Sequence, residues 1–157
     1  MDALESPDEI KITLRKATPA DIPAFIELEE SVSHTNTYSA AVTEEEWIDS
    51  LKKEKVFAIE VSGHLVGDLT YEYKSPQHVY ISGIVIVPEF QGKGIGGQVL
   101  GGLMEKFRDI QRVDLKTHPE NEKALKLYQR HGFKIESQEE NPFGDGERRV
   151  IMARVLD

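Results

Sequence analysis

Four of the six positions from 92 to 97 are glycine, and this run follows an apolar stretch that ends at Val87. Glycine adopts positive φ and lets a ligand approach the backbone without a Cβ in the way, a property that we expect both Gly94 and Gly96 to need. Apolar residues at helical spacing follow, so the free N–H groups of a first helical turn would point at an anion. A pyrophosphate is the natural ligand, and a glycine-rich turn without a ligand is the alternative.

Three kinds of phosphate-binding loop fit such a run to different degrees. A P-loop needs Ser or Thr after Gly-Lys, but Lys93 is followed by Gly94. The dinucleotide pattern G-x-G-x-x-G is matched by Gly92, Gly94 and Gly97, yet the run follows several expected strands, and Asp114 falls within the next strand rather than at its end. A nicotinamide-dependent oxidoreductase is therefore disfavoured. It would bind NADH and not coenzyme A.

Two motifs resemble the GNAT superfamily of acyl-CoA-dependent N-acyltransferases. The pyrophosphate motif of that family, Gln/Arg-x-x-Gly-x-Gly/Ala, is matched by Gln91, Gly94 and Gly96. Its second signature, Asn-x-x-Ala-x-x-Leu-Tyr-x-x-x-Gly-Phe, is matched without a gap by Asn121, Ala124, Leu127, Tyr128, Gly132 and Phe133. The resemblance extends over nearly the whole chain, from residue 11 to residue 156.

The resemblance implies acetyl-CoA as the cosubstrate and no metal. The backbone of the central strand would bind the pantetheine amides, at Ile84, Val85 and Ile86. The glycine loop, residues 91–97, would hold the pyrophosphate with Gln91, Gly92, Lys93, Gly94, Ile95, Gly96 and Gly97. Asn121 would touch the pantetheine arm, and Lys93 and Arg130 either meet nucleotide phosphates or are ordinary surface charges. The five histidines show no metal-ligand spacing.

The chain contains no cysteine, which excludes disulfides, thiolate zinc sites and a covalent cysteine intermediate. Direct attack of an amine on the thioester is therefore expected. The resemblance assigns Tyr128 as the general acid for the leaving sulfur, since a phenol with a pKa of about 10 keeps its proton at neutral pH. The alternative is that Tyr128, which shares a helix face with Ala124 and Leu127, only packs in the core.

The general base is left open among strand residues that would line the active site. The candidates are Glu72, His78 and Ser82, and period-2 spacing puts His78, Tyr80 and Ser82 on one face. Each is better explained as a solvated strand residue. Lys116 stands where some family members carry a catalytic glutamate, so that usual assignment does not transfer.

Hydrophobic periodicity predicts a strand, two helices, three strands, a helix, a strand, a helix and two final strands. Strands are expected at 11–16, 55–61, 65–74, 78–87, 112–117, 133–137 and 148–155. Capping boxes at Thr18 and Thr43 open the first two helices. Together with the resemblance, this predicts an α/β fold of the α+β type. A mixed, mostly antiparallel central sheet carries helices on both faces and contains one parallel βαβ unit.

The length of 157 residues and the hydrophobic fraction of 39% fit one domain, expected over residues 10–157 with a loose tail at 1–9. The formal charge of −9 disfavours a nucleic-acid binder. No signal peptide or membrane-length apolar run is evident, so a cytoplasmic protein without a membrane partner is expected, with a homodimer as one assembly.

These observations predict an N-acetyltransferase that moves an acetyl group from acetyl-CoA to a primary amine of a small molecule, peptide or protein. The alternative is a non-catalytic sensor domain that binds acyl-CoA, but Tyr128 and Asn121 favour catalysis. The loops Ser33–Ala41 and Asn141–Glu147 are expected to select the acceptor. A cationic acceptor is suggested by acidic residues that solvated helix faces explain as well, namely Glu27, Glu29, Glu30 and Glu44–Glu46.

Overall fold

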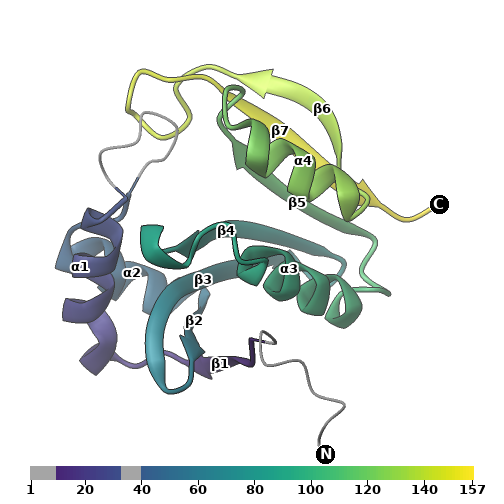
Figure 1. Ribbon diagram of the computed structural model, residues 1–157. Coiled ribbons are helices and arrows are strands. Elements are labelled where there is room, and N and C mark those ends of the chain that lie inside the picture. The colour runs from purple at the N-terminus through teal and green to yellow at the C-terminus, as the bar shows by residue number, and fades with distance from the viewer. Residues whose placement is uncertain (1–9, 33–39) are drawn as a thin grey trace, which may run out of the picture.

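The computed structural model describes residues 10–32 and 40–157, so the predicted tail and most of the predicted Ser33–Ala41 loop lie outside the described residues. The strands and α-helices follow one another in the predicted order (Figure 1). The strands are β1 (Ile12–Lys16), β2 (Lys55–Val61), β3 (His64–Ser75), β4 (His78–Ile86), β5 (Arg112–Thr117), β6 (Lys134–Glu139) and β7 (Arg149–Val155). The α-helices are α1 (Ile22–Glu30), α2 (Glu44–Lys53), α3 (Ile95–Lys106) and α4 (Glu122–Arg130).

All seven strands form one sheet in the order β1-β2-β3-β4-β5-β7-β6. Every neighbouring pair is antiparallel except β4 and β5, which are parallel and connected through α3. This is the mixed sheet with one parallel βαβ unit that the sequence predicted. Parallel neighbours need such a crossover because a tight turn can only reverse the chain.

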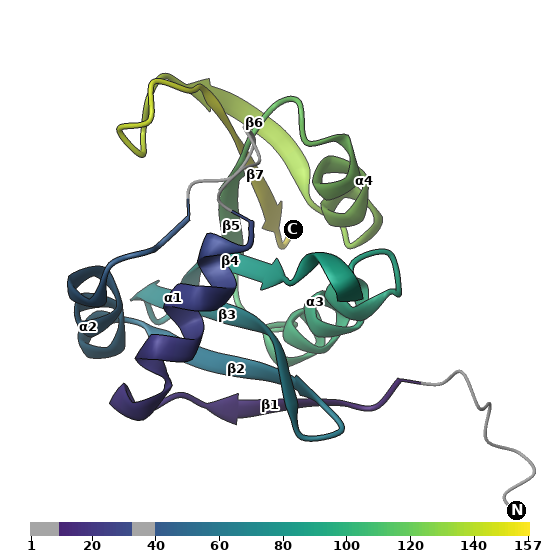
Figure 2. The same cartoon turned by 60° about the vertical axis from the view of Figure 1, so that its left-hand side comes forward.

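Helices cover both faces of the sheet (Figure 2). Helices α3 and α4 pack on one face in the main core, where Leu100 and Phe107 meet Val113 and Met152. Helices α1 and α2 pack on the other face over β2, with Phe25 against Trp47. None of the helices in residues 10–32 and 40–157 is long and apolar enough to cross a membrane.

Local sequence signals explain where the helices begin and end. Thr43 forms the predicted capping box with Glu46 at the start of α2. The box of Thr18 with Asp21 forms too, but it opens a short 3₁₀ turn, Pro19–Asp21, and α1 begins only after it at Ile22. Several strand ends were predicted wrongly by one or two residues: β1, β3, β4 and β7 each differ by one residue at one or both ends, and β6 begins one residue after Phe133 and ends two residues later than expected. The N–H of Phe133 donates to the carbonyl of the α4 residue five positions earlier at 3.1 Å, so Phe133 closes the helix end instead of starting the strand.

The two parallel strands remain paired only over part of their length. Their register runs from His78 opposite Arg112 to Ile81 opposite Leu115, and no later pair exists in the described residues. Beyond that point β4 stays with β3 and β5 stays with β7. We call the two parts the paired segment (His78–Ile81 with Arg112–Leu115) and the splayed segment (residues 82–86 with 116–117).

Candidate active site

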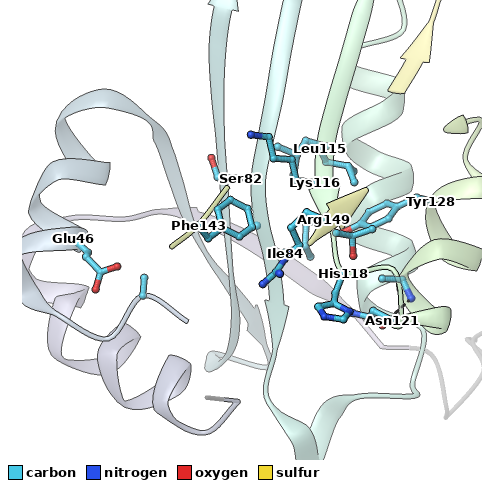
Figure 3. Close-up of a pocket in the computed structure, with 15 residues that line it drawn as sticks. Glu46, Ser82, Ile84, Leu115, Lys116, His118, Asn121, Tyr128, Phe143 and Arg149 are labelled. Atoms are coloured by element: carbon cyan, nitrogen blue, oxygen red, sulfur yellow. Dashed lines mark hydrogen bonds between the residues drawn. The ribbon is translucent and has the colours of Figure 1, made fainter. Parts of the chain in front are cut away.

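A cavity of about 350 Å³ opens between the strands of the splayed segment, and we call it the cleft (Figure 3). Strands β4 and β5, helix α4 and the connection before β7 all contribute to its wall. Its polar side chains are Glu46, Ser82, Lys116, Thr117, His118, Asn121, Tyr128 and Arg149. Residues far apart in the sequence thus converge where the sheet divides.

The edge of β4 that faces the cleft carries unpaired peptide groups. The Val87 N–H donates to the Val66 carbonyl on β3 at 2.9 Å. Peptide directions alternate along a strand, so Val85 also points to β3, whereas Ile84 and Ile86 point the other way, where β5 has departed. Of the three residues expected to bind pantetheine, Ile84 therefore offers its backbone groups to the cleft, and Val85 directs its own to β3. The Ile86 N–H is directed away from β3 like that of Ile84, but Ile86 does not line the cleft and its carbonyl accepts the Gln91 side chain.

The glycine loop leads from the end of β4 into α3 with its N–H groups free. Gly92 and Gly94 have φ of +77° and +81°, and a Cβ at either position would meet nothing within 4 Å. The first helical hydrogen bond of α3 runs from the Gln98 N–H to the Gly94 carbonyl at 3.0 Å. Within the described residues, the N–H groups of positions 92–97 consequently have no backbone acceptor. Such a row of donors fits a pyrophosphate.

The remaining glycines of the loop differ from this pattern. The expectation that Gly96 needs positive φ is wrong, because Gly96 lies in the first turn of α3. A Cβ at Gly96 or Gly97 would make only ordinary contacts with Leu127, at 3.8 and 3.6 Å. The Gln91 side chain donates from Nε2 to the Ile86 carbonyl at 2.9 Å and thereby ties the loop to β4. Lys93 is exposed, and Ile95 is buried in the core.

Tyr128 extends from α4 into the cleft. Its ring packs edge-on against Phe133, with centroids 5.7 Å apart. Its hydroxyl makes no hydrogen bond to any residue of the described chain, and burial raises the pKa of Tyr128 to about 12. The phenol therefore keeps its proton at physiological pH and has a free donor on the cleft side. Packing in the core and serving as an acid are compatible roles for this residue.

Asn121 and His118 approach the cleft from the segment between β5 and α4. The Asn121 Oδ1 accepts the Ala124 N–H at 3.2 Å and caps α4, which leaves the amide Nδ2 for a ligand. His118, which sequence reasoning missed, is only 5% exposed and accepts the Glu120 N–H at Nδ1 at 3.0 Å. The neutral ring then carries its proton on Nε2, which has no hydrogen-bond partner among the described residues and lies 3.8 Å from Glu147 Oε1. The sequence signal that could have identified His118 was its position directly after the strand that ends at Thr117 and shortly before Asn121.

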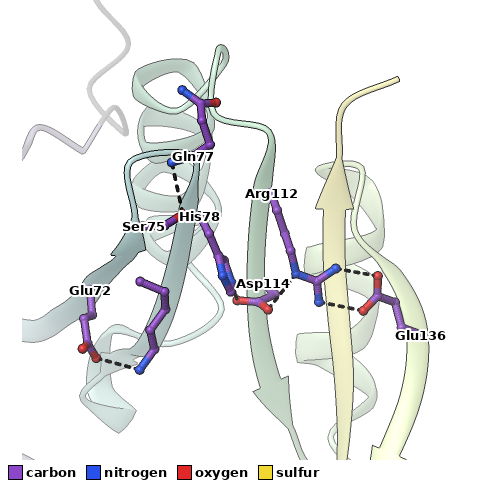
Figure 4. Close-up of polar contacts among 8 residues, drawn as sticks. Glu72, Ser75, Gln77, His78, Arg112, Asp114 and Glu136 are labelled. Atoms are coloured by element: carbon purple, nitrogen blue, oxygen red, sulfur yellow. Dashed lines mark hydrogen bonds and ion pairs between the residues drawn. The ribbon is translucent and has the colours of Figure 1, made fainter.

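The three base candidates occupy different places. Ser82 lines the cleft, and its hydroxyl donates to a carboxylate oxygen of Glu54 at the end of α2. His78 lies in the paired segment, beside a second cavity of about 340 Å³, with Nε2 2.8 Å from Asp114 Oδ1 (Figure 4). Glu72 pairs with Lys74 at 3.2 Å. Only Ser82 is among the residues that line the cleft.

An ion pair between the buried Arg149 guanidinium and Asp145 fixes the connection between β6 and β7 beside the cleft. Arg149 is 1% exposed, and its Nη2 lies 2.6 Å from Asp145 Oδ2. The guanidinium stands 5.1 Å from the ring centre of Phe143, which lines the cleft. The predicted acceptor loop Asn141–Glu147 therefore does contribute to the wall, through Phe143.

The other predicted acceptor loop meets the cleft at its described end. Ala41 lines the cleft, and its N–H donates to Glu29 Oε1 at 2.9 Å. Glu29 is 1% exposed, so its carboxylate binds the backbone N–H of Ala41 inside the protein and does not present its charge to an acceptor in the cleft. Burial and the adjacent Glu29 raise the pKa of Asp68 well above its usual range.

The described residues contain no group of three or more His, Asp or Glu side chains placed to hold a metal ion. The cationic side chains at the cleft are paired with carboxylates, Lys116 with Glu139 at 3.0 Å and Arg149 with Asp145. What the cleft leaves without partners are hydrogen-bond donors. These are the backbone N–H groups of the glycine loop, the Tyr128 hydroxyl and the His118 imidazole.

Known proteins share this fold and part of this sequence. Ard1 from Thermoplasma volcanium is 22% identical, with a TM-score of 0.78 over 93% of this chain and 98% of that one. RimL, a ribosomal L7/L12 alpha-N-protein acetyltransferase in complex with coenzyme A, is 22% identical, with a TM-score of 0.75 over 95% and 99% of the two chains.

Among curated proteins, the UPF0157 protein YqkA of Bacillus subtilis (strain 168) is 26% identical over 119 residues, which is 76% of this chain. The chain spans only 34% of the length of that relative. The model of the acetyltransferase (GNAT) family matches residues 22–133, from the start of α1 to the end of the second motif. The match includes the open edge of β4, the glycine loop, Asn121 and Tyr128, and the chain belongs to the GNAT family of acetyltransferases.

Proposed function

We propose that this protein transfers an acetyl group from acetyl-CoA to a primary amine by direct attack in a ternary complex. The observation that carries the proposal is the row of N–H groups at positions 92–97 without a backbone acceptor, which follows the N–H groups of Ile84 and Ile86 that are directed away from β3. A pyrophosphate joined to a chain of amides is complementary to such a surface. The acceptor is a small-molecule amine or an amine of a peptide or protein.

The two ends of coenzyme A call for different residues. The pyrophosphate would accept hydrogen bonds from the glycine loop, where the α3 dipole adds favourable charge. The pantetheine amides would form hydrogen bonds with the backbone of Ile84 and Ile86, in the way that an extended peptide binds along the exposed edge of a β-sheet. The Nδ2 of Asn121 faces the same route. This arrangement would direct the thioester toward Tyr128.

The chemistry follows from the groups at that end. The amine nitrogen attacks the thioester carbonyl, a C–N bond forms and the carbonyl oxygen gains negative charge. The Ile84 N–H is directed to the cleft and would stabilise this oxyanion. As the C–S bond breaks, Tyr128 donates its proton to the leaving sulfur. The contribution expected from one such acid is about 10²–10⁴-fold in rate.

Release of free thiol from acetyl-CoA, measured with a panel of polyamines, amino acids and peptides with free N-termini, tests the proposal. Mass spectrometry of the acceptor should show one added acetyl group for each thiol released. Thermal stabilisation by coenzyme A without turnover on any acceptor would contradict transfer and leave an acyl-CoA sensor. Stabilisation by NADH and not by coenzyme A would contradict the coenzyme assignment itself.

A further inference from the structure

We propose that Glu54 is the final proton acceptor for the attacking amine and that it acts through the hydroxyl of Ser82. The inference rests on the proposed acetyl transfer and names the base that the sequence left open. Ser82 stands on β4 two residues before Ile84, whose N–H faces the same cleft. Glu54 comes from a different element, 28 positions earlier in the chain.

The contact between these two residues is direct and held on both sides. The Ser82 hydroxyl donates to Glu54 Oε2. Glu54 is the C-terminal cap residue of α2, and its N–H donates to the Ser50 carbonyl at 2.7 Å, so the backbone fixes its position. Ser82 is the extra residue of a β-bulge in β4, where the register with β3 passes from Ile81 opposite Tyr71 to Gly83 opposite Thr70, so paired residues flank it on both sides. Because its proton is donated to a carboxylate, the Ser82 oxygen keeps its lone pairs for accepting a proton from an amine in the cleft.

Serine alone is too weak a base to deprotonate an ammonium group, so the carboxylate is needed. In the relay, the proton of the amine moves to Ser82 Oγ while the hydroxyl proton of Ser82 moves to Glu54 Oε2. The nitrogen lone pair is then free to attack the thioester carbon, and Glu54 becomes a neutral acid. Glu54 is half-buried, so its proton returns to solvent before the next turnover.

Other titratable groups near the relay already have partners or hold their protons. Tyr80 lies on the same face among Glu54, Glu72, Asp114 and Glu139, and burial with these charges raises the pKa of Tyr80 to about 12. Asp114 contacts His78, Glu72 contacts Lys74 and Glu139 contacts Lys116.

Within the cleft itself, the Glu46 Oε1 accepts the Thr43 hydroxyl at 2.8 Å and the Thr43 N–H at 3.2 Å. Lys53, the residue before Glu54, pairs with Asp49 at 3.1 Å. Among the described carboxylates, Glu54 is the one that receives a hydrogen bond from a hydroxyl lining the cleft.

The test compares two acceptors of the same shape but different basicity. One is the best amine from the acceptor panel, and the other is its analogue fluorinated beside the amino group, which is uncharged at pH 7. Glu54→Gln and Ser82→Ala should each lower kcat/KM for the basic amine by roughly 10²-fold at pH 7, as expected for a lost general base. The fluorinated amine needs no deprotonation before attack, so both variants should use it within about 3-fold of the wild-type rate.

Three further readouts separate a relay from a structural role. The double variant should be no slower than either single variant, because both changes break one pathway. The deficit with the basic amine should shrink as pH rises and the free amine becomes abundant. Asp109→Asn removes the same charge from a fully exposed position after α3 and should leave both rates unchanged. Titration with coenzyme A should give wild-type affinity for all variants and so confirm their folding.

An equal loss with both acceptors would overturn the relay, because it would mean that Glu54 only maintains the structure. Wild-type rates with the basic amine in both variants would overturn it as well. The failure of the proposed function has a different signature, since the wild-type protein would then acetylate neither amine.

Discussion

The strands β4 and β5 behave differently along their length, and the difference shows where ligands belong. In the paired segment the polar side chains satisfy one another: His78 contacts Asp114 at 2.8 Å, Asp114 contacts Arg112 at 3.0 Å, and Arg112 contacts Glu136 at 2.7 Å (Figure 4). Burial of polar groups is tolerated when each has a partner. This part of the sheet is complete without a ligand.

The splayed segment has the opposite character. The peptide groups of Ile84 face the cleft without a strand to pair with, and neither the Tyr128 hydroxyl nor the His118 Nε2 finds a partner among the described residues. Buried donors without acceptors are unfavourable by about 1–3 kcal/mol each unless something binds them. Two segments of the same strands thus divide into a closed polar network and a set of open donors, and we assign function to the second.

The largest effect is expected at the glycine loop. Gly94→Val should lower the affinity for coenzyme A by more than about 10²-fold, because losing two hydrogen bonds to a charged phosphate removes roughly 3 kcal/mol or more. Calorimetric titration with coenzyme A measures this change. The strained φ of +81° should also lower the free energy of unfolding, by about 1–3 kcal/mol.

Gly63→Val is the matched control, since Gly63 has φ of +79° and a Cβ there also meets nothing within 4 Å, but it lies in the β2–β3 hairpin. It should lose similar stability and keep full affinity for coenzyme A. Equal affinity in the two folded variants would refute the assignment of the pyrophosphate site.

The next effect compares two tyrosines with the same raised pKa. Tyr128→Phe should lower kcat by roughly 10²-fold with little change in acetyl-CoA affinity, because it removes only the proton donor. Tyr80→Phe, in the paired segment, should stay within about 3-fold of the wild-type kcat. Since the pKa of Tyr128 is about 12, the wild-type kcat should show no alkaline loss from this acid up to pH 10. A similar kcat for both variants would contradict the role of Tyr128.

A smaller effect is expected for the base candidate in the paired segment. His78→Asn should keep kcat/KM within about 3-fold of the wild type, since His78 does not line the cleft. It should lower the free energy of unfolding by about 1 kcal/mol through loss of the contact with Asp114. Steady-state kinetics and urea unfolding measure the two quantities. A loss of 10²-fold or more in kcat/KM would restore His78 as a base.

The smallest effect concerns the end of the polar network. The Arg112 guanidinium holds the pKa of Glu136 below its usual range, so this pair stabilises the fold above the unfolded pKa of about 4.3, and its contribution is lost as pH falls further. Glu136→Gln should therefore destabilise by at most about 1 kcal/mol at pH 7, because the pair is partly exposed. The difference from the wild type, measured by unfolding, should shrink as pH falls below about 4.3 and vanish once Glu136 is protonated in the folded protein as well. A difference that persists at such low pH would show that the side chain acts by packing instead of by charge.

Much of this arrangement could be predicted from the sequence because it depends on local patterns. The alternation of apolar and polar residues predicts the strands, and apolar residues at helical spacing predict the helices. The capping box of Thr43 and Glu46 predicts the start of α2. The glycine loop and the motif from Asn121 to Phe133 identify the side of the cleft that we propose binds the coenzyme. Each of these signals occupies consecutive positions, so one sequence suffices to read it.

The acceptor side was not predictable in the same way. Period-2 spacing puts His78 and Ser82 on one face, but it does not reveal that pairing ends after Ile81. Glu54 reaches Ser82 across 28 positions, and His118 becomes informative only when its Nε2 proves to be buried without a partner. These properties arise from tertiary packing, which leaves no periodic mark in the sequence.

Hydrogen exchange measured residue by residue, with and without coenzyme A, tests the division between the two segments most directly. Binding should slow exchange at Ile84, Ile86 and the N–H groups of residues 92–97, and it should leave the paired segment unchanged. Protection confined to residues 78–81 and 112–115, or no protection at the glycine loop despite saturating coenzyme A, would contradict the account.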